Sequence, residues 1–156
     1  MKDKKGIFSA IELAGYIMYK YSIMENRISD DISPLKLQKS LYFCFAYWGG
    51  FVRKGKDKKS EIEFTDGEYL FGERIEAWVY GPVVPDVYHA NKIESNDGTT
   101  IFKNKLYIKE FIDGLLNDIL PVSDFKLVEQ SHSDECWKRN FRKSEIFHNN
   151  EIPKEE

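Results

Sequence analysis

Several features are scarce in this sequence, and each scarcity excludes a class of protein. Two cysteines among 156 residues are too few for a disulfide framework. No apolar run approaches the roughly 18–20 residues that a membrane-spanning helix needs. The N-terminal stretch "MKDKKGIFSAIEL" is basic but lacks the long apolar segment and small-residue cleavage site of a signal peptide. We therefore expect a cytoplasmic protein without a membrane partner.

Charge of one sign is also missing. The formal net charge is -3 and charged residues make up 31% of the chain, so no strong electrostatic attraction to nucleic acid is expected. The length suits one domain. Aromatic residues are abundant at 15%, which indicates a packed core, an aromatic binding surface, or both.

Apolar residues recur at helical spacing through much of the chain. Ser9 and Glu12 have the spacing of a capping box and begin a helix that extends to about Arg27. Ser33 caps a second helix, which is apolar nearly all round after Lys39 and is therefore expected to be buried. The other expected helices are residues 85–92, 106–120 and 123–131, and one that starts at residue 133.

Breaks in these patterns predict the remaining structure. Gly49 and Gly50 are expected to end the second helix, and residues 53–60 to form a basic, mobile loop. In residues 75–80, small or aliphatic side chains alternate with larger polar or aromatic ones, which is the period of a strand. This strand could belong to a short hairpin with Asp66-Gly67 near its turn.

The predicted fold is mainly α, a compact single-domain helical bundle with a short β-hairpin or strand element around residues 61–80. Residues 1–8 are expected to be disordered, residues 9–148 to form the domain, and residues 149–156 to be a poorly ordered tail.

A zinc site is the first chemistry to consider. His132 and Cys136 lie four residues apart and would share a helix face, with His148, His89 and Cys44 as further ligands. However, the paired spacings of zinc sites are missing, and Ser133 as an N-cap would place His132 outside the helix. A packed histidine and a core thiol are the favoured interpretation, and no metal is predicted.

Other catalytic groups are equally weak. Cys136 with a nearby histidine lacks the local signature of known cysteine enzymes, and no phosphate-binding loop or carboxylate pair is present. Residues 53–59 are basic but diluted by Asp57, Glu61 and Glu63, so a solvated loop is favoured. We therefore predict a non-enzymatic binding protein without a cofactor.

The stretch "WVYGPVVPDVY" at residues 78–88 concentrates rigid and bulky residues. Pro82 and Pro85 fix φ and Gly81 permits a sharp bend, so this segment is expected to be a rigid corner with aromatic side chains clamped around it. Such a corner could be purely structural, which is the favoured role for any single residue. It could also present aromatic anchors that bind at low entropy cost.

The chain resembles the Panacea domain, an antitoxin domain found in bacteria and phages. The resemblance rests on "KLQKSLYF" at residues 36–43, "EAWVYGPVVPDVY" at residues 76–88, and Ser131-His132 followed by Trp137. Ser40 departs from the leucine usual in the first block, and the chain stops at "IPKEE", where family members often continue into a last helix.

The resemblance implies a helical domain that neutralises a toxin by binding it. It does not name the toxin or the oligomeric state. The expected partner-binding residues are Trp78, Tyr80, Gly81, Pro82, Val83, Val84, Pro85, Tyr88, His132 and Trp137.

Three alternatives stay open at this point. A phage or prophage copy could inhibit a host defence protein, or hand a target to a protease. Nucleic acid would be a partner only if the protein repressed its own operon, and no clear recognition helix is visible. A metal-dependent hydrolase using His132 and Cys136 is the most distant alternative.

Overall fold

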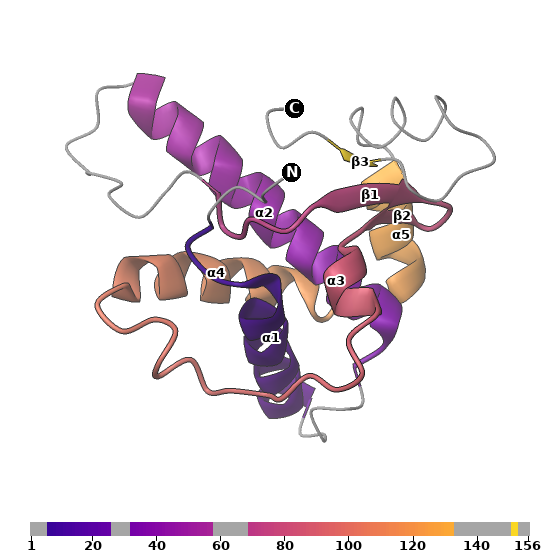
Figure 1. Cartoon of the computed structure of the whole chain (residues 1–156), viewed down its shortest axis with the longest axis horizontal. Helices are drawn as coiled ribbons and strands as arrows, with labels where there is room; N and C mark the ends of the chain where they lie inside the picture. Colours follow the sequence, from indigo (N-terminus) through magenta and orange to yellow (C-terminus); the bar gives the residue numbers. More distant parts are fainter. Residues whose placement is uncertain (1–5, 26–31, 58–68, 133–150, 153–156) are drawn as a thin grey trace.

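The computed structural model describes residues 6–25, 32–57, 69–132 and 151–152 (Figure 1). Within these ranges the helix α2 runs through the middle of the molecule and contacts α1, α3, α4, α5 and β2. The elements are α1 (Ala10–Glu25), α2 (Pro34–Asp57), β1 (Ile75–Trp78), β2 (Gly81–Val83), α3 (Pro85–Tyr88), α4 (Leu106–Ile119), α5 (Asp124–His132) and β3 (Glu151–Ile152). The predicted mainly α fold with a short β-hairpin is confirmed.

The helix starts follow the capping signals of the sequence. The backbone N–H of Glu12 donates to Ser9 Oγ at 3.1 Å, and the N–H of Ser9 donates to Glu12 Oε1 at 3.2 Å, which is the reciprocal pattern of a capping box. Ser33 Oγ accepts from the N–H of Lys36 at 3.0 Å. These contacts confirm the predicted starts of α1 and α2.

The predicted end of α2 at Gly49 and Gly50 is wrong. The helix continues through both glycines to Asp57, so the expected loop at residues 53–60 is helical over residues 53–57. The rings of Trp48 and Phe51 lie 5.4 and 5.2 Å from the ring of Phe111 on α4. We attribute the continuation to this aromatic packing, which outweighs the roughly 1 kcal/mol that each interior glycine costs a helix.

The hairpin lies further along the chain than the sequence indicated. Strand β1 pairs with β2, with Trp78 opposite Gly81, so the turn falls at Val79 and Tyr80. Asp66-Gly67, the expected turn, lies outside the described residues. The helix expected over 85–92 is only α3, Pro85–Tyr88.

Both ends of the chain take part in the fold where they are described. The N–H groups of Ile7 and Phe8 donate to the carbonyls of Tyr69 and Leu70 at 3.0 and 2.9 Å, so the expected disorder of residues 1–8 does not hold for residues 6–8. Residues 151–152 form β3, which pairs with the free edge of β1. The expectation of a poorly ordered tail is therefore wrong for these two residues.

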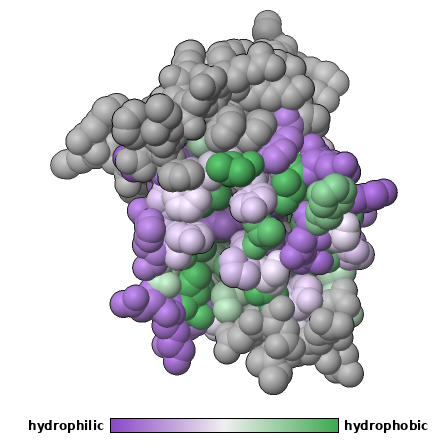
Figure 2. All heavy atoms as spheres, turned by 90° about the vertical axis from the view of Figure 1, so that its right-hand side faces the viewer, coloured by the Kyte–Doolittle hydropathy of each residue, from purple (hydrophilic) through white to green (hydrophobic). Residues whose placement is uncertain are grey.

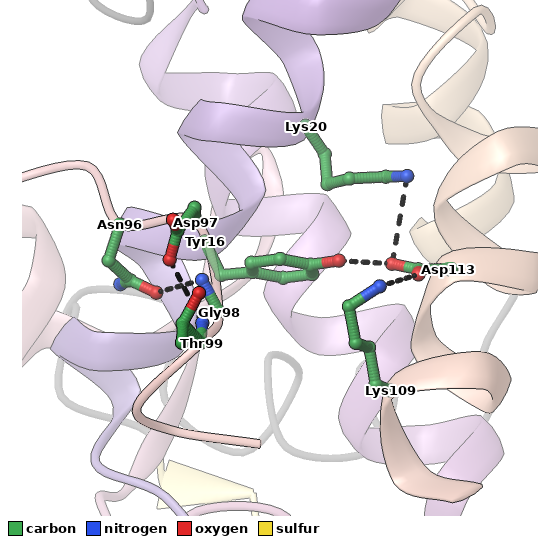
Figure 3. Close-up of polar contacts among 8 residues, drawn as sticks. All are labelled: Tyr16, Lys20, Asn96, Asp97, Gly98, Thr99, Lys109 and Asp113. Atoms are coloured by element: carbon green, nitrogen blue, oxygen red, sulfur yellow. Dashed lines mark hydrogen bonds and ion pairs between the residues drawn. The ribbon is translucent and has the colours of Figure 1, made fainter. Parts of the chain in front are cut away.

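A polar cluster links α1 to α4 (Figure 3). The Tyr16 phenol donates to Asp113, which also pairs with Lys109 Nζ at 2.8 Å and Lys20 Nζ at 3.7 Å. Burial, and then the Asp113 carboxylate, raise the pKa of Tyr16 above its ordinary value. Gly98 has φ +83°, and a Cβ there would lie 2.7 Å from the Tyr16 ring. The turn at Gly98 therefore packs against the Tyr16 ring, which extends from α1 to Asp113 on α4.

None of the helices in the described part of the chain combines the length and apolar character required to cross a bilayer.

The course of α2 can be tested at Gly50. No described atom lies within 4 Å of a Cβ built on Gly50, so Gly50→Ala should raise the free energy of unfolding by about 0.5–1 kcal/mol, as expected inside a helix. Urea unfolding followed by circular dichroism measures the change. Gly98→Ala is the control and should lower stability. If Gly50→Ala lowers stability too, the helix does not continue through this position.

Candidate functional site

Two polar side chains of α2 hold the segment that follows β1. The Gln38 amide bonds the backbone of Val84 twice: Nε2 donates to the carbonyl at 3.3 Å, and Oε1 accepts from the N–H at 2.8 Å. Lys39 Nζ donates to the carbonyl of Pro82 at 2.8 Å. Both side chains are buried. They satisfy backbone groups that would otherwise be buried without partners, and they fix residues 82–84 against the helix.

Gly81 lies where α2, the hairpin and α5 meet. Its φ is +108°, and an added Cβ would lie 2.4 Å from Ser131 Oγ and 3.1 Å from Lys39 Cε. A glycine is required both by the backbone conformation and by the lack of space. The three sequence blocks quoted for the resemblance thus meet at one point, through Lys39, Gly81 and Ser131.

The expected partner-binding residues divide into two groups by exposure. Five lie in the buried interior of the corner: Gly81, Pro82, Val83, Val84 and Pro85. Tyr80 and Tyr88 are exposed, and Trp78 and His132 are partly buried. Trp137 lies outside the described residues. The buried group shapes the corner, and the accessible group is what a partner could reach.

The indole of Trp78 is held from two sides. Its Nε1 donates to Glu76 Oε1 at 2.9 Å, and its ring packs edge-to-face on Tyr88 with centroids 4.9 Å apart. Glu76 is itself buried and paired with Arg74. The side chains of Trp78 and Tyr88 are therefore positioned by contacts within the chain.

A pocket of about 460 Å³ opens beneath these aromatic residues. Figure 2 views the molecule from the side of α3, β2 and α5, where apolar and weakly polar side chains gather between hydrophilic flanks. The pocket is lined by Pro34, Leu35, Gln38, Lys39, Trp78, Val79, Tyr80, Val83 and Tyr88. Its walls are mostly apolar, and its polar groups come from the side chains that anchor the corner.

The Lys39 ammonium beside this pocket is electrostatically unusual. Burial lowers its pKa from 10.5 to about 8, and no carboxylate within the described ranges forms an ion pair with it. Burial also lowers the pKa of His132, with a smaller contribution from the Lys39 charge, while a hydrogen bond with the Val79 backbone acts in the opposite sense.

The zinc candidates do not come together in the described structure. His132 lies in the last turn of α5, while the helix expected to start at Ser133 lies outside the described residues. Cys136 and His148 lie outside the described residues. Within the described ranges, no three His, Cys, Asp or Glu side chains are grouped closely enough to hold a metal ion.

Gln38 and Lys39 were not among the expected site residues, although they belong to the quoted block at residues 36–43. Leu37–Tyr42 are all buried, so the helix is enclosed on every side there. The available signal was two long polar side chains in a stretch expected to be buried, because such groups need specific partners.

Comparison with known proteins gives one match. The family model described as "Antitoxin SocA-like, Panacea domain" matches residues 64–138. The match includes β1, β2, α3, α4 and α5 and two of the three quoted blocks, and it confirms the resemblance over those residues. No curated protein and no solved structure matches the chain.

The buried state of Lys39 predicts a pH effect on stability. Because its pKa is lowered to about 8 in the folded state, the unfolded chain binds more protons between pH 8 and 10.5, and this group stabilises the fold increasingly as pH rises through that window. Relative to Lys39→Met, the wild type should gain up to about 3 kcal/mol across it.

Urea unfolding of both proteins at several pH values measures this difference. Titration of tyrosines and Cys44 affects both proteins alike and cancels. A constant difference between pH 8 and 10.5 would show that Lys39 is not desolvated.

Proposed function

Because residues 64–138 match the family model of SocA-like antitoxins with a Panacea domain, we propose that this chain is a non-enzymatic binding module that neutralises a toxin by direct contact. The observation that carries the proposal is that the matched segment forms a rigid corner with accessible aromatic side chains beside an apolar pocket. Pockets of this kind receive the anchor side chains of protein partners.

The rigidity of the corner supports this role. Tyr80 and Tyr88 are 62% and 55% exposed and line the same apolar pocket, so they form one accessible aromatic surface that a partner can reach. Between these two tyrosines along the chain, Lys39 bonds the backbone of Pro82 and Gln38 bonds the backbone of Val84. Little conformational entropy is then lost when a partner binds, and more of the contact energy contributes to affinity.

The chemistry of the described residues gives no competing argument for catalysis. Cys44 is buried, and burial raises its pKa to about 12, which disfavours the thiolate that a nucleophilic cysteine needs at neutral pH. The buried side chains of the site, Gln38, Lys39 and Glu76, each bond the protein itself.

The test is co-expression with each small protein encoded directly beside this chain, after its toxicity has been measured by expressing it alone. We expect the wild type to restore growth and to co-purify with that protein. Tyr80→Ser combined with Tyr88→Ser should weaken the complex at least tenfold, because truncating central aromatic anchors costs 2 kcal/mol or more. The fold should survive, since both side chains are exposed.

Phe125→Ser is the matched control. Phe125 is 72% exposed on α5 and lines neither this pocket nor its neighbour, so affinity should not change. An unchanged complex in the double tyrosine variant would show that another surface binds.

Failure of the wild type to protect would overturn the antitoxin role. Capture of a host defence enzyme from lysate would support the counter-defence alternative, and toxin loss only in the presence of a protease would support the adaptor alternative.

A further inference from the structure

The pocket beside Trp78 has a neighbour, and the two recesses together are called the groove below. A second pocket of about 420 Å³ lies between α1, α2 and α3. The two pockets share three lining residues, Pro34, Gln38 and Tyr88. Because Tyr88 lines both, it stands between two adjoining recesses that a single bound segment could fill together.

The two halves differ in chemistry. The first recess has apolar and aromatic walls, including Leu35, Trp78 and Val83. The lining of the second also includes the exposed polar residues Asn91 and Lys92. A complementary ligand therefore needs a large apolar group at one end and a polar or charged group at the other.

The described residues that line the groove carry charge of one sign. Among its described lining residues, the charged side chains are Lys39 and Lys92, and no Asp or Glu lines either recess. Asp86, the acidic residue of α3, lines neither. This is notable in a chain with a formal net charge of -3. The positive lining disfavours basic segments, and the apolar walls are not those of a phosphate-binding channel.

We infer that this groove binds a short acidic–apolar segment of the partner protein. One large apolar side chain enters the recess beside Trp78, and a neighbouring carboxylate lies near Lys92. The positive charge of the buried Lys39 also favours a negatively charged ligand over a positively charged one. This inference rests on the proposed function, since it names the part of the partner that the antitoxin surface recognises.

Three small probes test the charge preference without any partner. 3-Phenylpropionate, 3-phenylpropanamide and 3-phenylpropylamine carry the same aryl group on a similar short chain and are anionic, neutral and cationic. In NMR titrations of the labelled protein, we expect shifts at Trp78 and Tyr88. The anion should bind about threefold more tightly than the amide, as is usual for one exposed charge pair, and the amine should bind most weakly.

Lys92→Gln should clearly reduce the difference between anion and amide, leaving only the contribution of Lys39, while the amide affinity stays unchanged. Lys126→Gln, a change at an exposed lysine of α5 outside both recesses, is the matched control and should keep the difference. Equal binding of the three probes, no detectable binding of any probe, or shifts confined to other surfaces would overturn the inference.

A charge reversal separates this inference from the proposed function. If the wild type binds its toxin and Lys92→Glu weakens the complex at least fivefold, both stand. If Lys92→Glu binds the toxin as tightly as the wild type does, the antitoxin function stands, and the inference that the groove binds an acidic segment is wrong. If no toxin binds but the probes still rank anion first, the groove stands and the antitoxin function falls.

Discussion

The arrangement of this protein depends on two polar side chains buried in the middle of its longest helix. Gln38 bonds the peptide groups of Val84 and Lys39 bonds the carbonyl of Pro82. A proline-rich segment forms few backbone hydrogen bonds of its own, because proline has no N–H to donate. The helix supplies the missing partners, so the corner is positioned by specific bonds as well as by apolar packing.

This dependence crosses the boundary of the family match. The matched residues 64–138 include the corner and its aromatic side chains, but Gln38 and Lys39 lie outside that range. Ser131 of α5 packs against Gly81 and leaves no room for a side chain there. The candidate binding surface is therefore a product of the whole fold, and its rigidity comes from α2 as much as from the segment that carries the resemblance.

Local signals predicted local structure well. The Ser9–Glu12 capping box begins α1 as expected, because a cap depends on residues within one turn. The end of α2 was predicted wrongly because Gly49 and Gly50 end a helix only where no tertiary packing stabilises its continuation. Here Trp48 and Phe51 pack on Phe111, which belongs to a helix distant in sequence. The hairpin turn at Val79 and Tyr80 was missed because Gly81, which follows it, was interpreted as a bend from a strand into a helix and not as the start of a second strand.

The sequence by itself determined the helical periodicity, most helix starts, and the resemblance that led to a binding function. It also identified residues 78–88 as a rigid corner. Only the tertiary structure decided that Gly81–Pro85 are buried while Tyr80 and Tyr88 are exposed. It also decided that Gln38 and Lys39 bond the backbone of Val84 and Pro82. The reason is physical: periodicity and caps are properties of adjacent residues, whereas exposure and hydrogen-bond partners depend on which distant segments come together.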